Sequence, residues 1–499
     1  MNRFTKSMVA LCASFALVAS MAGSADAATP KTAKKPVVAQ KHGAPKKSTG
    51  AKKPVAKPAK SRKTSTTTKV AVTTTKVAVA KKTGSVNAQR MGSSRGNQRV
   101  TAAKPQPVVV RDPNQAPPVV AGAIARDLKP LVKDASEWVK TVGASSQMAG
   151  LAIAIVKDND IVFEKGVGVV DKATNTPVLT STVFRLASLS KAFAATLAGL
   201  LVRDGVIQWD TRIVNLLPTF ALADTAGETL TVRDIMSQRA GLPHNAFDHD
   251  LEGDEPYPML VDKLRSVPLA CPVGDCYAYQ NVAFSLIGDV TYAATGDFFY
   301  YQVEKRIFHP LHMDTATYGR EALESSASWA RPHVRSGGGW RAIAPKDNYY
   351  RVPPAAGVNA SINDMAQWLI AQMGGRTDVL PAKLLDELHK PLVNTPRELR
   401  SSPWRRARLT DAHYGLGWRV FDYAGETMIF HGGAVQGYRS LIAFLPKYRF
   451  GMVMLWNNEA ALPSGLMPMV MDRYLGLPAT NWAGIDSDDS EASVTGGGD

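Results

Sequence analysis

The sequence predicts an α/β fold of the α+β kind, in which one antiparallel sheet is flanked by helices and joined to an α-helical domain. Three observations predict this fold. Strand-like segments open the globular part at residues 150–171, and further ones close it between residues 427 and 458. Between them, residues 205–420 are a long region of helices and loops. This order fits one sheet to which the strands at both ends of the domain contribute, with the helices inserted between them.

The first element along the chain is a predicted secretory signal peptide at residues 1–27. It has a basic start at Arg3 and Lys6, a short apolar run and a small-residue cleavage site ending at Ala27. The sequence therefore predicts export, to the periplasm or into the medium. No later segment has about 18 uninterrupted apolar residues, so no transmembrane segment is expected.

Residues 28–118 form a predicted disordered tether rich in Lys, Ala, Pro and Thr. Residues 28–111 contain 21 Lys or Arg and no Asp or Glu. Because the whole chain carries +16 and its first 111 residues carry +22, residues 112–499 carry −6. The tether has two open interpretations, which are adhesion to anionic cell-envelope polymers and a plain charged spacer. Nucleic acid is not an expected partner, because an exported protein rarely meets it.

The globular domain is expected to span residues 119–480. It begins with an amphipathic helix at 125–142 and a β-hairpin at 150–171 that turns near Asp158. Strands are expected at 427–433, 438–446 and 449–458, and a final helix at 463–476. Residues 481–499 are acidic and are expected to be a disordered tail.

A serine and a lysine three residues apart stand at the start of an apolar helical stretch. In "FRLASLSKAFAATLAGLL", Ser188 and Lys191 share one helix face, so the amine can reach the hydroxyl. A serine nucleophile needs a base, and burial favours the neutral form of lysine, which can accept the proton. The helix start also directs backbone N–H groups toward a developing oxyanion. An ordinary amphipathic helix with an outward lysine remains the alternative.

Two further stretches strengthen the catalytic interpretation. "CYAYQNVAFSL" places Tyr279 and Asn281 before an apolar helix, where a phenol can relay a proton and an amide can hold substrate. "MIFHGGAVQGYRS" ends a strand at His431, and the glycines that follow allow a ligand to approach the backbone. A core tyrosine with a helix-capping asparagine remains the alternative for the first stretch.

These stretches, in this order, resemble the serine β-lactamase and penicillin-recognising peptidase superfamily, in its class C β-lactamase and DD-peptidase branch. "TVRDIMSQRAGLP" at 231–243, "PPAAGVNASINDMAQWL" at 353–369 and "YGLGW" at 414–418 are also similar to segments of that family. The resemblance covers about residues 145–475. It implies a sheet domain and an α-helical domain with the site between them.

The resemblance also implies a role for each site residue. Ser188 would be the acylated nucleophile, Lys191 its base, and Tyr279 the proton shuttle to the leaving group. The other implied positions bind substrate. Asn281 would contact the acyl side chain, and His431, Gly432 and Gly433 take the place of the family's Lys-Thr-Gly. The backbone N–H of Ala434 would form the oxyanion hole together with that of Ser188. His431 at the first position resembles peptidase and esterase members, and Gly432 lacks the threonine hydroxyl that holds a substrate carboxylate.

Two smaller motifs lie within residues 243–276. Cys271 and Cys276 enclose a turn-like segment, and in an exported chain they are expected to form a disulfide, with two unpaired thiols as the alternative. The stretch "PHNAFDHD" at 243–250 offers His244, Asp248, His249 and Asp250 as metal ligands. An acidic surface loop near the site is the preferred interpretation of that stretch, so no metal is expected.

The sequence thus predicts an exported serine hydrolase that forms an acyl-enzyme on Ser188. Its expected substrates are D-amino-acid peptides or amides of the cell wall, then β-lactams. An esterase of the same family and a non-catalytic protein that binds the envelope or peptidoglycan are the alternatives. No cofactor is expected, because serine acyl transfer needs none.

Overall fold

The computed structural model describes residues 122–485. The predicted signal peptide, the whole predicted tether at residues 28–118 and residues 486–499 of the predicted tail lie outside the described residues. The main sheet has nine strands in the order β3-β2-β1-β14-β13-β12-β11-β10-β9, and every neighbouring pair is antiparallel. Its strands are β1 (Gly150–Lys157), β2 (Asp160–Asp171), β3 (Thr176–Pro177), β9 (Val393–Asn394), β10 (Leu409–Tyr414), β11 (Arg419–Tyr423), β12 (Glu426–Val435), β13 (Tyr438–Leu445) and β14 (Phe450–Trp456).

Strand β1 lies inside the sheet and is buried on both faces. Its even-numbered residues Ala152, Ala154 and Val156 pack in the core shared with the helical region, whereas its odd-numbered ones pack in a second core. Successive side chains of a strand point to opposite faces, so a strand covered on both sides is apolar at every position. This explains the continuous apolar run "GLAIAIV".

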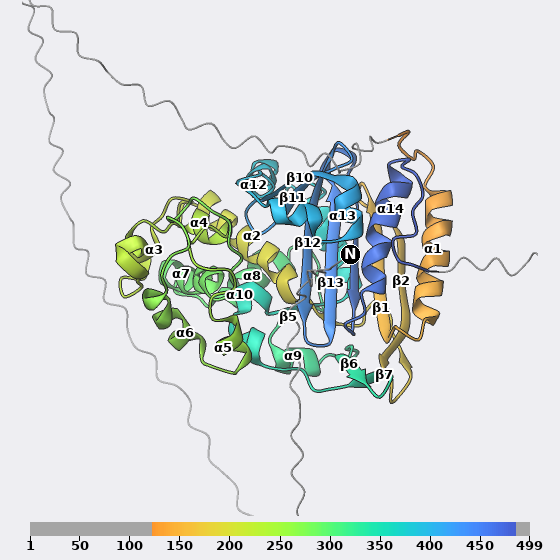
Figure 1. Ribbon diagram of the computed structural model, residues 1–499, viewed down its shortest axis with the longest axis horizontal. Helices are drawn as coiled ribbons and strands as arrows, with labels where there is room; N and C mark the ends of the chain where they lie inside the picture. Colours follow the sequence, from red (N-terminus) through yellow and green to blue (C-terminus); the bar gives the residue numbers. More distant parts are fainter. Residues whose placement is uncertain (1–121, 486–499) are drawn as a thin grey trace, which may run out of the picture. The chain divides into compact units, whose positions relative to one another are not determined.

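Helices α1 (Lys129–Ala144) and α14 (Leu466–Tyr474) pack together over the second core, on one face of the sheet (Figure 1). The buried residues of α1, which are Leu131, Ala135, Val139 and Val142, recur at the spacing of a single helix face. Helix α11 (Ile362–Gln372) contacts β1 and β14 and belongs to the other core. The sheet is therefore covered on both faces.

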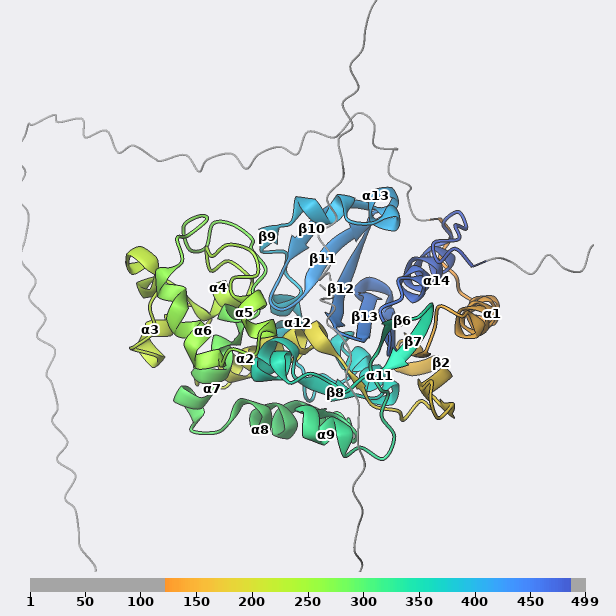
Figure 2. The ribbon, with the colours of Figure 1, turned by 60° about the horizontal axis from the view of Figure 1, so that its bottom comes forward.

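The helical region lies on the side of the sheet that is away from α1 (Figures 1 and 2). Helix α2 (Ser190–Arg203) stands between the two parts, and Ser190 through Leu201 are all buried. The other helices are α3 (Ile213–Leu216), α4 (Val232–Met236), α5 (Asp248–Glu252), α6 (Tyr257–Lys263), α7 (Leu286–Thr295), α8 (Phe299–Val303), α9 (Arg320–Glu324), α10 (Pro353–Ala356), α12 (Ala382–Leu388) and α13 (Pro403–Arg408). Two small sheets complete the chain: β4 (Phe184–Arg185), β8 (Val358–Ala360) and β5 (Thr317–Tyr318) form one, and β6 (His333–Ser336) and β7 (Gly339–Ala342) form the other.

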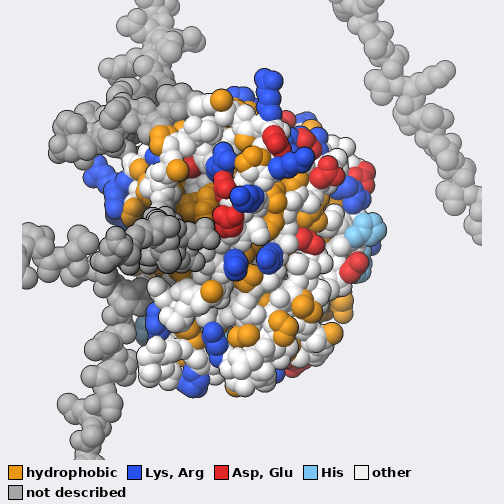
Figure 3. All heavy atoms as spheres, turned by 90° about the vertical axis from the view of Figure 1, so that its right-hand side faces the viewer, with side chains coloured by type: hydrophobic (Ala, Val, Ile, Leu, Met, Phe, Trp, Pro, Cys, Tyr) orange, Lys and Arg blue, Asp and Glu red, His pale blue; other side chains and the backbone are white. Residues whose placement is uncertain are grey.

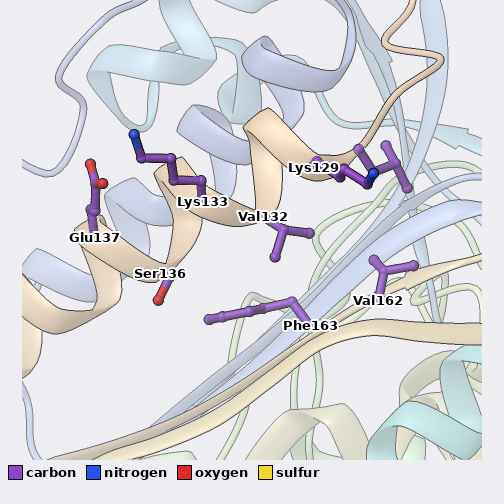
Figure 4. A pocket seen from close by; sticks show the side chains of 8 residues that line it. Lys129, Val132, Lys133, Ser136, Glu137, Val162 and Phe163 are labelled. Atoms are coloured by element: carbon purple, nitrogen blue, oxygen red, sulfur yellow. The ribbon is translucent and has the colours of Figure 1, made fainter.

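The surface over α1 carries basic, acidic and apolar side chains that are interspersed (Figure 3). A shallow groove of about 640 Å³ runs between α1 and β2. Figure 4 shows Phe163 of β2 below Val132, with Lys133, Ser136 and Glu137 on the helix above it. This groove lies on the α1 side and shares no lining residue with the cleft at Ser188.

The predicted fold is confirmed: one antiparallel sheet combines both ends of the domain, and a helical region is inserted between them. The hairpin turns at Asp158, which has a positive φ of 57°. Residues 481–485, where the acidic tail was expected to begin, pack on the domain, because Trp482 Nε1 donates to Asp472 Oδ2 at 2.8 Å. Among residues 122–485, no helix is both long and apolar enough to cross a lipid bilayer.

Candidate active site

Ser188 lies in a short 3₁₀ helix, η1 (Ala187–Leu189), which leads directly into α2. Its neighbours Leu186, Ala187 and Leu189 are fully buried, whereas Ser188 is partly exposed to a cleft. Ala187 has a positive φ of 51°, a conformation that costs free energy in a residue with a side chain. The backbone before the serine is therefore held in a strained turn that presents the hydroxyl.

The amine of Lys191 points back to Ser188 from the first turn of α2. Lys191 Nζ lies 3.5 Å from Ser188 Oγ, 2.6 Å from Asn281 Oδ1 and 3.1 Å from the carbonyl oxygen of Ala355. The side chain is fully buried, and Nζ lies 4.5 Å from the ring centroid of Tyr279. The alternative of an outward-pointing lysine is therefore wrong.

Burial lowers the pKa of Lys191 to about 7, because desolvation disfavours the ammonium form. The negative charge of Asp248 opposes this shift, and the positive charge of Arg419 adds to it. A substantial fraction of Lys191 is therefore neutral at pH 7 and can accept the serine proton.

The segment that carries Tyr279 and Asn281 is held in place by backbone contacts. Asn245 N donates to Tyr279 O at 2.8 Å, and Gln280 N donates to the side-chain oxygen Oε1 of Gln238 at 2.7 Å. Burial raises the pKa of Tyr279 above its usual value, and its interaction with the Ser188 side chain works in the opposite direction. The phenol therefore stays protonated at neutral pH and can serve as a proton donor.

The glycines of β12 allow the strand to approach the nucleophile closely. A Cβ atom added to Gly433 would lie 2.2 Å from Ser440 Oγ and 2.3 Å from the carbonyl oxygen of Leu186. One added to Gly432 would meet only ordinary contacts at 3.7 Å or more. Gly432, Gly433 and Ala434 all line the cleft, and Ala434 is exposed to it.

His431 lies behind this wall, 1% exposed. Its Nε2 is 3.2 Å from the hydroxyl of Tyr414, and its Nδ1 is 2.9 Å from the carbonyl oxygen of Gly432. Burial, followed by the charges of Arg419 and Lys191, lowers its pKa well below the usual value. The imidazole is therefore neutral, and it supports the site without lining the cleft.

The cleft has a volume of about 560 Å³ and brings together residues from both parts of the domain. Its lining includes Ser188, Tyr279 and Asn281. Of the β12 residues singled out in the sequence, it includes Gly432–Ala434 but not His431. It also includes Arg419 of β11, which the sequence analysis missed, and Arg439 of β13. The side chain of Arg419 is 15% exposed and pairs with Glu398 at 2.7 Å. An arginine within the apolar strand "WRVF" was the available signal for it.

Asp248 is a second addition. The 243–250 loop lies at the surface beside the cleft, as predicted, with His244 and His249 exposed, but Asp248 itself is buried. Its side chain is buried at the cleft wall, and its Oδ2 accepts a hydrogen bond from Asn281 Nδ2 at 2.7 Å. Asn281 thereby links Asp248 to Lys191. Residues 122–485 contain no group of three or more His, Cys, Asp or Glu side chains that could hold a metal ion.

The predicted disulfide between Cys271 and Cys276 is present. It closes the loop that immediately precedes Tyr277 and Tyr279. The carbonyl oxygen of Cys271 also lies close to Gly241, because a Cβ atom added there would approach it to 2.6 Å. The loop that the disulfide closes thus packs against the segment that leads to Asp248.

The chain is similar to known proteins in sequence and in fold. The chain is 27% identical over 367 residues to Unguisins hydrolase ungD of Aspergillus violaceofuscus, which covers 67% of this chain and 63% of that protein. It is 26% identical over 337 residues to Penicillin-binding protein 4 of Amycolatopsis lactamdurans, covering 66% of this chain and 86% of that one. The chain thus spans less than two thirds of the hydrolase's length.

Solved structures share the fold. The octameric penicillin-binding protein homologue from Pyrococcus abyssi superposes with a TM-score of 0.61 at 20% identity, covering 70% of this chain and 78% of that chain. SurE superposes with a TM-score of 0.56, also at 20% identity, covering 70% of this chain and 76% of that chain. The Beta-lactamase family model matches residues 135–467, which is more than half of the chain. The chain therefore belongs to the Beta-lactamase family, as its sequence motifs predicted.

Proposed function

We propose that this protein is an exported serine hydrolase that works through an acyl-enzyme on Ser188. The observation that carries the proposal is the position of Lys191 Nζ, 3.5 Å from Ser188 Oγ and 4.5 Å from the centroid of the Tyr279 ring, behind the cleft that Ser188 and Tyr279 line. Family membership and a relative named a hydrolase support the same class of activity. Export, to the periplasm or the medium, rests on the signal peptide predicted at residues 1–27.

In the acylation step, Ser188 Oγ attacks the carbonyl carbon of the substrate and its proton passes to neutral Lys191. The bond to the leaving group then breaks, and Tyr279 donates a proton to the departing nitrogen or oxygen. The phenol recovers its proton from Lys191, which returns to its neutral form. Water attacks the acyl ester in the second step, and the same groups move its proton to Ser188.

The backbone N–H groups of Ser188 and Ala434 form the proposed oxyanion hole. The close approach of β12 to η1 supports this role, because an added Cβ on Gly433 would lie 3.2 Å from Ser188 N. Donors fixed by a strand and a helix start need no reorganisation as charge develops on the oxygen.

The proposed substrates are D-amino-acid peptides or amides of the cell wall, followed by β-lactams and small esters. Arg419 and Arg439 line the cleft and suit a substrate carboxylate. The missing hydroxyl at Gly432 and the buried, neutral His431 favour a peptidase or esterase over an efficient class C β-lactamase. Asn281 contacts the acyl group, and His431 acts through its contact with Tyr414.

A non-catalytic envelope protein is the rival, since the basic segment at 28–118 suits anionic polymers. One experiment separates the two. The full-length protein is incubated with a penicillin, and its intact mass is followed over time beside Ser188→Ala. A serine-dependent adduct supports the enzyme: persistence indicates a penicillin-binding peptidase, and rapid clearance with ring-opened product indicates a β-lactamase. The absence of any Ser188-dependent adduct or turnover with penicillins, D-amino amides and esters would refute the proposed enzyme activity.

A further inference from the structure

Asp248 is a buried carboxylate with an unpaired oxygen in the cleft wall. Only 8% of the residue is exposed. Its Oδ2 accepts a hydrogen bond from Asn281, whereas its Oδ1 has no donor among the described residues. A buried carboxylate is costly unless it is hydrogen-bonded or paired with a cation. The site therefore lacks one donor that a ligand could supply.

The loop that carries Asp248 is fixed to the catalytic segment. In the turn that precedes Asp248, both Asn245 and Phe247 have positive φ angles, of 55° and 62°. Asn245 N donates to the carbonyl oxygen of Tyr279, and Asp248 N donates to the carbonyl oxygen of Asn245. Strained backbone of this kind persists only where its surroundings hold it. The carboxylate consequently keeps a fixed position relative to Tyr279.

Asp248 lies on the side of Ser188 that faces the helical region. Asn281 connects it to Lys191, and Tyr349 lines the same part of the cleft. The sheet contributes Gly432–Ala434 of β12 and Arg439 of β13 to the lining of the cleft. Since Asn281 is the proposed contact of the acyl group, Asp248 lies on the acyl side of the scissile bond.

Two carboxylates, those of Asp248 and Glu252, lie on this side. Burial raises the pKa of Asp248 to about 6, so the carboxylate is still mostly ionised at pH 7. Glu252, which accepts a hydrogen bond from the hydroxyl of Tyr349 at 2.8 Å, adds to the negative potential at Asp248. The nearby cation that stabilises ionised Asp248 is Lys191. When Lys191 is neutral, as its role as base requires, Asp248 loses this counter-ion.

We propose that Asp248 binds the ammonium group of the substrate, so that the enzyme prefers acyl donors with a free amine, such as unblocked D-amino-acid amides and peptides. The inference rests on the proposed hydrolase function and adds its substrate class. An ammonium group donates to Oδ1 and replaces the charge that Lys191 gives up. An N-acylated substrate lacks the positive charge of the ammonium group and has fewer N–H protons to donate, so it should bind less well.

The competing explanation is that Asp248 only orients Asn281. Asp248→Asn separates the two, because its amide oxygen can still accept the hydrogen bond from Asn281 although the charge is gone. Asp250→Asn, two residues further along α5, is the matched control. Asp250 has the same charge, and its side chain is 39% exposed and 3.9 Å from Lys263.

The test compares kcat/KM at pH 7 for D-alanine p-nitroanilide and N-acetyl-D-alanine p-nitroanilide. We expect the wild type and Asp250→Asn to prefer the free amine by about tenfold or more. Asp248→Asn should lose most of this preference through a loss with the free-amine substrate, whereas any change caused by the lower pKa of Lys191 is shared by both substrates. Equal losses for both substrates, or no preference in the wild type, would overturn the inference.

A second measurement does not depend on turnover. Binding of each enantiomer of 1-aminoethylboronic acid and of its N-acetyl derivative is measured by calorimetry, with Ser188→Ala as control. Tighter Ser188-dependent binding of a free amine, lost in Asp248→Asn, supports the inference. Ser188-dependent binding without preference overturns it and leaves the proposed hydrolase intact. Absence of any Ser188-dependent binding or turnover overturns the proposed function and the inference with it.

Discussion

Lys191 Nζ lies 3.5 Å from Ser188 Oγ, and its two closer polar contacts are the neutral oxygens of Asn281 and Ala355. The amine is thus surrounded by dipoles that orient it, and it makes no direct ion pair within the described residues. A direct carboxylate partner would hold the proton on Lys191. The arrangement found here leaves the amine free to exchange a proton with the serine.

Replacement of the base should suppress acylation. We expect Lys191→Met to slow the formation of the Ser188 adduct by about 10²- to 10⁴-fold, the range typical of a lost general base. Intact mass spectrometry with a penicillin or an activated ester measures the rate, and Ser188→Ala supplies the zero level. Acylation of Lys191→Met at the wild-type rate would show that another group is the base.

The pH dependence of acylation should report Lys191. Because burial lowers its pKa to about 7 and only the neutral amine accepts a proton, the rate should rise as pH increases toward 7 and level off above it. Removal of the positive charge in Arg419→Met should raise the pKa of Lys191 and move the inflection to higher pH. Removal of the negative charge in Asp248→Asn should move it to lower pH.

Arg419→Lys is the matched control for this profile, because it keeps the charge and changes only the guanidinium geometry. Its inflection should stay close to that of the wild type. Identical inflections in Arg419→Met and the wild type would contradict the electrostatic assignment. The measurement is kcat/KM across pH 5 to 9 with an uncharged ester, whose own protonation does not change in this range.

Tyr279 should matter most for poor leaving groups. Its phenol stays protonated because burial raises its pKa, so Tyr279→Phe removes a proton donor. We expect hydrolysis of an amide to fall by about 10²-fold or more, and that of a p-nitrophenyl ester to fall much less, since nitrophenolate leaves unprotonated. Steady-state kinetics with the two substrates checks this. Equal losses would assign Tyr279 a role other than protonation of the leaving group.

The two glycines of β12 should differ in their tolerance of a methyl group. In Gly433→Ala the new Cβ would collide with Ser440 Oγ and the carbonyl oxygen of Leu186, so β12 must move away from η1. We expect acylation to fall by about tenfold or more and the protein to lose about 1–3 kcal/mol of stability. Gly432→Ala, whose Cβ meets only ordinary contacts, should change stability by less than about 1 kcal/mol. Thermal unfolding and adduct formation test the pair.

The disulfide should contribute modestly to stability. For the short loop between Cys271 and Cys276, the loop-entropy relation gives about 2 kcal/mol. Chemical denaturation of the oxidised protein and of a Cys271→Ser, Cys276→Ser variant measures the difference. No change in the free energy of unfolding would show that local packing alone fixes this loop.

Local patterns were sufficient to predict most of the fold. The alternation and apolar runs at 427–433, 438–446 and 449–458 predicted β12, β13 and β14 within two residues at each end. Burial on both faces of β1 follows from its unbroken apolar sequence. Which strand pairs with which depends on tertiary packing, and the prediction that both ends share one sheet rested on the order of the elements along the chain.

The site was predicted in part, and the omissions share a physical cause. Ser188, Lys191 and Tyr279 stand out because each lies in a stretch with a recognisable chemical pattern. Asp248 and Arg419 are charged residues whose burial is decided by distant segments: Asp248 is covered where the 243–250 loop meets Asn281, and Arg419 where β11 meets Glu398. A charged residue in a loop or strand looks exposed until those partners are known.

The pairing of β1 with β14 determines when the protein can fold. Leu151 lies opposite Trp456, so an interior strand of the sheet waits for a partner from the far end of the polypeptide. A ribosome must release nearly the whole domain before this central ladder forms, and long-range pairing of this kind folds slowly. Late completion of the central sheet suits the export proposed above, because a general secretion channel passes chains that have not yet closed their fold.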